Sequence, residues 1–498
     1  MPWRKRISTG SLEGGQARVN RGSASSQAAS GRVYAALVVC LAVFGLLRLA
    51  ASMGDFYIDE IWSFYFSRQL DSPWGVFSLN HDNNHILNTL YLYIVGGEPF
   101  FFGGRPTFIP HRLFSVISGV ISLFLVWKIA SRRGQIEAFT ALILAGLSYP
   151  LVIYSSEARG YAPEIMFALA SFLLVQARLS GSRVAAFFFW AFAPLAFLSH
   201  SSFIYIYAAL FVWSALEEVK NNGVLAGARR LAFLHLVPVI FSALYYLFFL
   251  KGMVYGGGEV GGAWKEVVQT ALMAVGASSF GWSTGIAALA ALLLLSIFGL
   301  ISLRKASPGQ PVFYILAIFI VPALIIVALK PEFLYFRYFL VCFPFLYLLA
   351  AHALSGLYGR KGFGKPVFFV VMIVFCALNI KSDFDLIKYG RGSYSEALEY
   401  MVKETAGPEV VVAGDHDFRN KLVLGFYSGF FPGKRVAYLD KEGRDGFVPG
   451  WIINHSVDRA YRPLEYVFDS GYRFTLKKSY GFAGVSGWSW FVYKKDDQ

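Results

Sequence analysis

Long apolar runs constrain this chain more than any other feature of its sequence. A helix needs about 20 consecutive apolar residues to cross roughly 30 Å of hydrocarbon, and the runs at 231–250 and 284–303 reach that length. Hydrophobic residues make up 56% of the 498 positions and charged residues 15%, which is too little polar material to cover a soluble protein of this size. The sequence therefore predicts a polytopic α-helical membrane protein.

The membrane domain is predicted to occupy residues 33–380 and to contain about 11 transmembrane helices. The candidate spans are 33–51, 112–130, 136–154, 162–178, 184–198, 201–216, 231–250, 284–303, 312–329, 338–356 and 366–380. The segment 86–102 is also apolar, but Gly96-Gly97, Glu98 and Pro99 weaken a lipid-exposed helix. We expect 86–102 to be re-entrant or interfacial, within a large first external loop at 52–111.

Basic residues predict the orientation in the membrane, because Lys and Arg favour cytoplasmic loops. The basic connectors are Arg132-Arg133, Arg178 with Arg183, Lys220 with Arg229-Arg230, Arg304-Lys305, and Arg360-Lys361 with Lys365. They alternate with connectors of another kind, at 155–161, 199–200, 251–283 and 330–337, which we place outside. Residues 1–32, rich in Arg, Ser and Gly, are predicted to be a disordered cytoplasmic tail. The expected location is the plasma (inner) membrane, with the C-terminal region extracytoplasmic.

Residues 381–498 have the sequence pattern of a soluble α/β domain. Strands are predicted at 409–414, 434–439, 451–455 and 488–495, and Ser393 with Glu396 forms a capping-box pattern before a helix. Asp415-His416-Asp417 follows the first strand and is best explained as a polar turn. No phosphate-binding glycine fingerprint follows any of these strands.

The net charge of +14 does not indicate a nucleic-acid partner. Residues 381–498 carry 17 Lys and Arg against 16 Asp and Glu, so the excess lies in the membrane domain, where basic loops explain it. The three cysteines, Cys40, Cys342 and Cys376, lie in apolar runs without metal-ligand spacing.

An acidic pair, Asp59-Glu60, follows the first predicted span. Ionised groups beside hydrocarbon are costly, so we take these residues as catalytic candidates, although they could be ordinary loop carboxylates. Adjacent carboxylates repel each other, which predicts a raised pKa for one of them and a role as general base.

Other polar residues fall on the same predicted outer face. Substrate-binding candidates are Arg112, Glu157, Arg159, Tyr161, His200, Arg337, Tyr338, His81, Asp82 and His85. For each basic residue the alternative is a side chain that reaches to lipid headgroups. His81, Asp82 and His85 could coordinate a divalent ion, but a polar loop explains them better, so we assign no metal ligand and leave a divalent cation open as a cofactor.

In order and spacing, the residues of about 50–350 resemble the GT-C membrane glycosyltransferases, in particular the protein O-mannosyltransferase and aminoarabinose-transferase-like group. The stretches concerned are Asp59-Glu60, NNHILNTLYLY, RLFSVISG, SSEARGYAPE and RYFLVCFPFLYLL. The chain departs from the group where Asn88 and its neighbours replace the usual prolines. The resemblance implies an inverting glycosyltransferase, with Asp59 as the base, Arg112 and Arg159 handling the phosphate and the acidic loop, and Arg337 and Tyr338 as a late basic-aromatic element.

The activity that the resemblance implies is transfer of one sugar from a polyprenyl-phosphate carrier to an acceptor on the outer face. The acceptor could be a glycolipid, a glycan or a protein, and membrane lipids are the other expected partners. Arginine suits a phosphate donor because its guanidinium pairs bidentately with phosphate oxygens. One alternative is a flippase or transporter for a lipid-linked sugar, whose sites should lie near the bilayer midplane. The other is an O-antigen polymerase or ligase.

Overall fold

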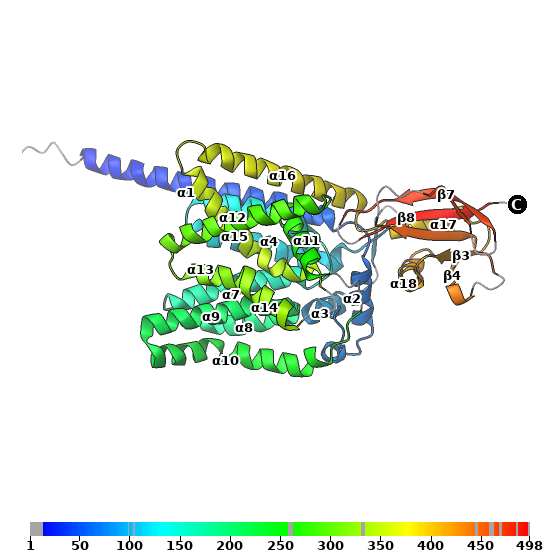
Figure 1. The fold of residues 1–498 in the computed structure, drawn as a ribbon, viewed down its shortest axis with the longest axis horizontal. Coiled ribbons are helices and arrows are strands. Elements are labelled where there is room, and N and C mark those ends of the chain that lie inside the picture. The colour runs from blue at the N-terminus through cyan, green and yellow to red at the C-terminus, as the bar shows by residue number, and fades with distance from the viewer. Residues whose placement is uncertain are drawn as a thin grey trace, which may run out of the picture.

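The computed structural model describes residues 13–97, 99–102, 105–256, 262–329, 334–443, 447–457, 463–467, 471–484 and 487–496. Several predicted features lie partly outside these residues, namely positions 1–12 of the tail, Glu98 of the apolar segment 86–102, 257–261 of the glycine-rich connector and 330–333 of the late outer connector. Within the described residues the chain forms a helical bundle and a sheet domain at one end of it (Figure 1).

Nine helical segments in the described part of the chain are long and apolar enough to cross a membrane. They are formed by α1 (Glu13–Ala51), α4 (Ile109–Ser131), α7 (Tyr161–Leu179), α9 (Ile204–Asn222), α10 (Val224–Phe248), α12 (Trp282–Ala306), α13 (Gln310–Ile315) with α14 (Val321–Leu329), η5 (Phe336–Cys342) with α15 (Phe343–Tyr358), and α16 (Gly364–Tyr389). A π-helical turn, η4 (Leu316–Ile320), joins α13 to α14. Large apolar side chains such as Phe248, Leu294 and Val370 are exposed, as expected for surfaces that face lipid. The predicted polytopic helical fold is confirmed.

Two further predicted spans are helical but differ from a straight crossing. The segment 136–154 forms α5 (Gln135–Leu147) and α6 (Tyr149–Ser155), which are bent by 62°. Pro150 lies in the first turn of α6, and a proline there interrupts helical hydrogen bonding. The freed N–H of Tyr149 donates to the Asn379 side chain at 2.8 Å, so the break stays satisfied inside the bundle. The other segment, 184–198, forms the shorter helix α8 (Val184–Ser199).

The apolar segment 86–102 does not form a membrane-length helix. It contains α3 (Ile86–Val95), whose 10 residues rise only about 15 Å, and then the short strand β1 (Phe100–Phe102), which pairs with β2 (Arg105–Thr107). This length favours the predicted interfacial placement. α3 lies beside α2 (Ile58–Arg68) at the end of the bundle next to the sheet domain (Figure 1).

Helix α1 begins at Glu13, so residues 13–32 differ from the predicted disordered tail. Adding a residue to an existing helix gains one backbone hydrogen bond and needs no new nucleus. A membrane helix that starts near residue 33 can therefore extend into a segment whose own composition is weakly helical.

The basic connectors lie at the end of the bundle opposite the sheet domain (Figure 1). Side chains from several of them meet there: Arg133 donates to Gln310, and Arg178 and Arg230 each approach Glu218 to 3.9 Å. The bundle thus has one end with basic connectors and another end that carries the sheet domain. Which end faces the cytoplasm stays a prediction.

In its described residues, the C-terminal domain is a six-stranded mixed sheet with two α-helices. Its strand order is β4-β3-β5-β8-β7-β6, with β3 parallel to both β4 and β5. The elements are α17 (Tyr394–Glu404), β3 (Glu409–Gly414), α18 (Asp417–Ser428), β4 (Arg435–Tyr438), β5 (Trp451–Ser456), β6 (Glu465–Val467), β7 (Arg473–Tyr480) and β8 (Ser489–Lys495). The four predicted strands are confirmed, whereas β6, β7 and α18 were not predicted.

The bundle and the sheet domain share a hydrophobic core. Phe56 of the membrane domain stacks on Phe108 and on Phe426 of α18, and the tilted rings of Phe108 and Phe426 lie 5.7 Å apart. The predicted capping box at Ser393 is wrong, because Ser393 makes no side-chain capping hydrogen bond. Instead Asp55, just after α1, accepts the backbone N–H and the hydroxyl of Ser395 at 2.7 and 2.8 Å. The membrane domain therefore caps the first helix of the sheet domain.

Candidate active site

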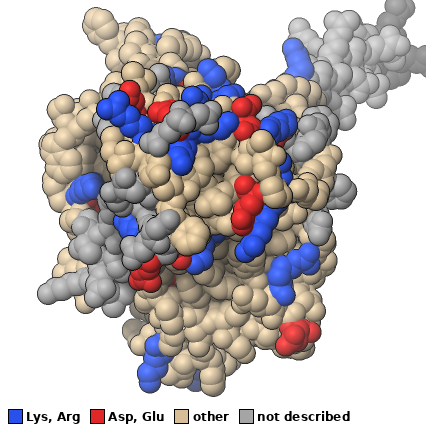
Figure 2. All heavy atoms as spheres, turned by 90° about the vertical axis from the view of Figure 1, so that its right-hand side faces the viewer, with Lys and Arg blue, Asp and Glu red and all other residues tan. Residues whose placement is uncertain are grey.

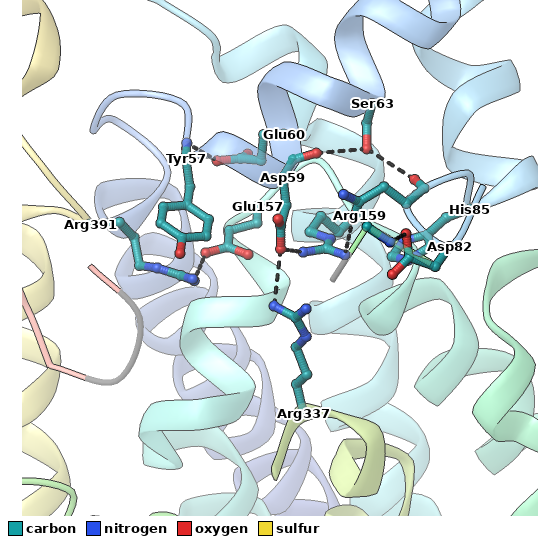
Figure 3. A network of polar contacts seen from close by, with 12 residues as sticks. Tyr57, Asp59, Glu60, Ser63, Asp82, His85, Glu157, Arg159, Arg337 and Arg391 are labelled. Atoms are coloured by element: carbon teal, nitrogen blue, oxygen red, sulfur yellow. Dashed lines mark hydrogen bonds and ion pairs between the residues drawn. The ribbon is translucent and has the colours of Figure 1, made fainter. Parts of the chain in front are cut away.

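Four segments that are distant in sequence bring charged side chains together where the bundle meets the sheet domain (Figure 3). They are the first turn of α2, the turn 156–160 between α6 and α7, the start of η5, and the linker 390–393 between α16 and α17. Asp59 lies at the centre of this group, with Arg159 and Arg337 directed toward its carboxylate. Several of the residues that were predicted to lie on one face are therefore close together in the structure.

Asp59 is held between two arginines. Its Oδ2 accepts hydrogen bonds from Arg159 and from Arg337, the latter at 3.0 Å, and the side chain is 13% exposed. Burial alone would raise the pKa of this carboxyl, but the charges of Arg159, Arg337 and Arg391 outweigh burial and lower the pKa to about 2. The expectation that repulsion within the acidic pair raises the pKa is wrong for Asp59. While it is paired with the two arginines, the Asp59 carboxylate is ionised and strongly stabilised.

Glu60 faces away from Asp59 and pairs with Arg112. The Nε and Nη2 atoms of Arg112 donate to the two Glu60 carboxylate oxygens at 2.8 and 2.7 Å. The same carboxylate accepts the backbone N–H of Tyr57 at 2.9 Å and that of Ala158 at 2.7 Å. Glu60 is 0% exposed. Both of its carboxylate oxygens are therefore hydrogen-bonded, and Glu60 serves as an anchor.

Arg112 is equally engaged and does not reach the Asp59 carboxylate. Its remaining guanidinium N–H groups donate to three backbone carbonyls, those of Ser52, Gly54 and Asp55. The Glu60–Arg112 pair thus ties α2 to the end of α1 and to the turn 156–160. This arrangement fits the implied role of holding the acidic loop and leaves no free Arg112 donor for a phosphate.

Glu157 pairs with Arg391, a residue that sequence reasoning missed. Arg391 Nη1 donates to Glu157 Oε1, and both side chains are 5% exposed. Burial raises the pKa of Glu157 to about 7, against the opposing charges of Arg391 and Arg159. The only sequence signal for Arg391 was its place in a Gly-Arg-Gly linker between the last membrane helix and the sheet domain.

Two histidines, His85 and His200, lie next to the turn that carries Arg159. The His85 Nδ1 atom accepts the backbone N–H of Gly160 at 2.7 Å, and the His85 ring lies 4.9 Å from the ring of His200 and 5.3 Å from that of Tyr161. A side chain at Gly160 would collide with the Ser199 carbonyl, so glycine is needed for this close approach. Burial lowers the pKa of His85 well below its usual value and that of His200 to about 3, so both rings are neutral. They support the turn that presents Arg159.

His81 and Asp82 do not join His85 in a ligand set. Asp82 pairs with His81 at 2.9 Å and accepts the N–H of Gly256, while the His81 ring stacks on Trp62. Their neighbour Asn83, which sequence reasoning did not select, contacts the site by accepting a hydrogen bond from Arg159 Nη2 at 2.9 Å. Across the described ranges, no group of three or more His, Cys, Asp or Glu residues is arranged to hold a metal ion.

Arg337 and Tyr338 lie together as the predicted basic-aromatic element. The Arg337 guanidinium lies 4.6 Å from the ring of Tyr335 and 5.9 Å from that of Tyr338. Its side chain is 17% exposed, more than the 2% of Arg159. Cation–π contacts with these two neighbouring rings, whose centroids are 5.8 Å apart, fix its orientation. Arg337 is thus the more accessible of the two arginines that hold Asp59.

No protein-family model and no curated protein sequence match this chain. Solved structures do. The chain is similar to ArnT from Cupriavidus metallidurans in the apo state, with a TM-score of 0.49 and 14% identity over 93% of this chain and 98% of that one. It is similar to the same protein bound to undecaprenyl phosphate, with a TM-score of 0.49 and 12% identity over 91% of this chain and 97% of that one.

A second protein gives a weaker match. The Archaeoglobus fulgidus oligosaccharyltransferase, in a complex with Zn and sulfate, matches with a TM-score of 0.43 and 12% identity, over 84% of this chain and 68% of that chain. With such low identities and TM-scores below 0.5, the function proposed below rests on the residues of this chain.

Proposed function

We propose that this protein is an inverting glycosyltransferase that moves a single sugar from a polyprenyl-phosphate carrier to an acceptor on the extracytoplasmic face of the membrane. One observation supports it most: the Asp59 carboxylate lies between two arginines at the end of a bundle of membrane helices. A carboxylate can take the proton of an acceptor hydroxyl, and arginines can bind a phosphate at the depth of lipid headgroups.

The two arginines explain how an acid with so low a pKa can act as a base. Without a donor, Arg159 and Arg337 share their charge with Asp59. The phosphodiester of a bound donor would compete for these guanidinium groups, and Arg337 is the more exposed one. Each positive charge drawn toward the donor stabilises the Asp59 carboxylate less, so the pKa of Asp59 rises when the donor binds. The Asp59 carboxylate would then be an effective base only when the donor is bound.

The proposed reaction is one displacement at the anomeric carbon. Asp59 takes the proton of the acceptor hydroxyl, the acceptor oxygen forms a bond to the anomeric carbon, and the bond from that carbon to the phosphate oxygen breaks. The phosphate leaves with the electron pair and gains a negative charge, which Arg159 and Arg337 stabilise. Attack opposite the leaving group inverts the configuration.

The position of the charges argues against a flippase. A transporter is expected to bind its cargo near the bilayer midplane, whereas Asp59, Arg159 and Arg337 lie at the end of the bundle beside the sheet domain. An enzyme that transfers whole glycans would use the same donor chemistry. It would be distinguished by the size of the transferred group.

The test is release of polyprenyl phosphate by the full-length protein in lipid nanodiscs. Polyprenyl-phosphate-linked hexose, pentose and aminosugar donors are offered with an envelope lipid and glycan extract. We expect one donor to be consumed, with one sugar added to the acceptor by mass spectrometry. Asp59→Asn should lower the rate at least about 100-fold, since general base catalysis contributes about that much.

The matched control is Asp440→Asn, the same chemical change at a partly exposed position whose carboxylate pairs with Lys421 in the sheet domain. It should transfer sugar at the wild-type rate. Undiminished activity in Asp59→Asn, with both variants inserted and folded, would contradict the proposed role of Asp59. Movement of intact donor across the bilayer without release of polyprenyl phosphate would favour the flippase.

A further inference from the structure

The sheet domain has a second polar cluster at the carboxyl ends of its parallel strands. Asp415 follows β3 directly, and His455 lies near the end of β5. β3 lies between β4 and β5 in the sheet. The chain leaves β3 toward β4 on one side of it, and β5 lies on the other side. Ligands of open α/β sheets bind in the crevice that such a reversal of strand order creates. The fold therefore places these two side chains where a ligand is expected.

Buried polar atoms in this cluster lack partners. Arg419, in the first turn of α18, is 5% exposed, yet its Nε and Nη2 atoms make no hydrogen bond within the described residues. The same holds for Asp415 Oδ1. Arg419 Nη2 and Asp415 Oδ1 are 3.9 Å apart, which is too far for a hydrogen bond between them. One hydroxyl oxygen between these atoms could accept from Arg419 and donate to Asp415, since a hydroxyl does both.

The second carboxylate oxygen of Asp415 is already used. Asp415 Oδ2 accepts the backbone N–H of His455 at 2.9 Å and pairs with the His455 Nδ1 atom. The contact holds the imidazole in place and leaves Nε2 as the other polar atom of the ring. Donors and acceptors of fixed orientation thus lie side by side, as recognition of a polyhydroxylated molecule requires.

The charges disfavour an anionic ligand. Asp415 and Asp417 lie at the N-terminus of α18, where an anion would otherwise bind. The N–H of Arg419 is directed to His416 Nδ1 at 3.4 Å, so this amide is not free for an anion either. Among the described residues, the face at this end of the molecule mixes Lys and Arg with Asp and Glu (Figure 2). A ligand with neutral hydroxyl groups fits better than a phosphate.

A stack of side chains joins this cluster to the candidate active site. The Arg419 guanidinium lies 4.1 Å from the ring of Trp488, and Trp488 stacks on Tyr57 with ring centroids 5.5 Å apart. Tyr57 is two residues before Asp59, and the Arg391 guanidinium lies 4.1 Å from its ring centroid. The cluster is therefore two ring contacts away from the segment that carries the proposed base.

We propose that Asp415, Arg419 and His455 form a subsite that binds hydroxyl groups of a carbohydrate acceptor. Its identification with the acceptor, as opposed to the donor, rests on the transfer reaction proposed above. The membrane helices would bind the lipid-linked donor, and the sheet domain would hold the sugar that receives the transferred group. This assigns to the C-terminal domain a part in selecting the acceptor.

Binding is tested with the full-length protein in nanodiscs and with methyl glycosides of a hexose, a pentose and an N-acetylhexosamine as probes. Saturation-transfer NMR detects each glycoside and titration gives its affinity. We expect at least one glycoside to bind, and Asp415→Asn and Arg419→Lys to weaken its binding roughly tenfold or more, as expected for loss of a hydrogen bond to a charged group. Asp440→Asn, the control in the same domain, should bind as the wild type does.

Asp59→Asn separates the two proposals. It should still bind the glycoside, because Asp415, Arg419 and His455 are unchanged, and fail to transfer sugar. The subsite is contradicted if no glycoside binds, or if binding survives in both Asp415→Asn and Arg419→Lys, whose folding is checked by thermal unfolding. Transfer by a wild-type protein that binds no glycoside would overturn the subsite alone. Glycoside binding that depends on Asp415, without transfer from any donor, would overturn the proposed function and keep the subsite.

Discussion

Two carboxyl groups in the candidate site differ in their electrostatic surroundings. Asp59 has two arginines on one oxygen, and its pKa is lowered to about 2. Glu157 has one arginine, and burial raises its pKa to about 7. A group with a pKa near 7 changes its charge in the physiological range. The Glu157–Arg391 contact, which joins the membrane domain to the linker of the sheet domain, should therefore depend on pH.

Replacing Glu157 with Gln should remove a pH dependence of stability. From about pH 4.5, the usual pKa of the group, to about pH 7, the folded protein binds this proton more strongly than the unfolded chain does. The contribution of Glu157 to stability is therefore present at low pH and is lost as the pH rises through that window, by at most about 1.4 kcal/mol per pH unit.

Thermal unfolding of the detergent-solubilised protein from pH 4.5 to 8 measures this effect. The difference between the wild type and Glu157→Gln should change across the window. Glu409→Gln, a change at a more exposed glutamate in the same protein, should run parallel to the wild type. Parallel curves for Glu157→Gln as well would contradict a raised pKa for Glu157.

At the scale of elements, helix ends connect the two parts of the molecule. The N-terminus of α2 is held by Glu60, which reaches back to the N–H of Tyr57 at 2.9 Å as a third-position glutamate can. The N-terminus of α17 is held by Asp55, which lies 340 positions before Ser395. A residue that caps a helix across such a separation orders that helix only when both domains are docked.

Asp55→Ala should loosen the start of α17. Loss of a cap costs about 1–2 kcal/mol, which corresponds to an increase of about 5–30-fold in local opening. Hydrogen–deuterium exchange of the backbone amides at 395–398 measures that opening. Ser393→Ala provides the control, because Ser393 is at the cap position but makes no capping hydrogen bond through its side chain. Equal exchange in the two variants would mean that Asp55 does not cap α17.

At the scale of the whole molecule, the two ends of the bundle differ in chemistry. One end collects the basic connectors, and the other carries the candidate active site and the sheet domain (Figure 1). Lys and Arg favour the cytoplasmic side, so the sheet domain is predicted to be extracytoplasmic. Lipid-linked donors and envelope acceptors would then meet at the same face.

Cysteine labelling tests this orientation in intact cells. In a protein whose Cys40, Cys342 and Cys376 are replaced by serine, a membrane-impermeant thiol reagent should label Asp440→Cys in the sheet domain. It should leave Lys361→Cys, in a basic connector, unlabelled until the cells are opened. Lys361 is exposed and the Asp440 side chain is 38% exposed, so the reagent can reach either position within the fold. Labelling of Lys361→Cys alone would invert the predicted orientation.

Much of the fold follows from local patterns in the sequence. Apolar runs predicted the helices, because the bilayer requires a fixed length of apolar helix with all its backbone hydrogen bonds satisfied. Stretches rich in β-branched and aromatic residues predicted β3, β4, β5 and β8. The strands β6 and β7 were missed because their residues are more polar and mostly exposed or half-buried, which leaves a weak pattern.

By itself, the sequence determined that the chain is a membrane protein with a C-terminal α/β domain, and it marked Asp59 as a functional candidate. Only the tertiary structure decided the partners of each charge. In the structure Glu60 pairs with Arg112 as an anchor, whereas Asp59 pairs with Arg159 and Arg337. Arg391 and Trp488, which are distant in sequence, also lie at the site. The physical reason is that burial and the pairing of charges depend on contacts between distant segments, whereas helix length and apolarity are local properties.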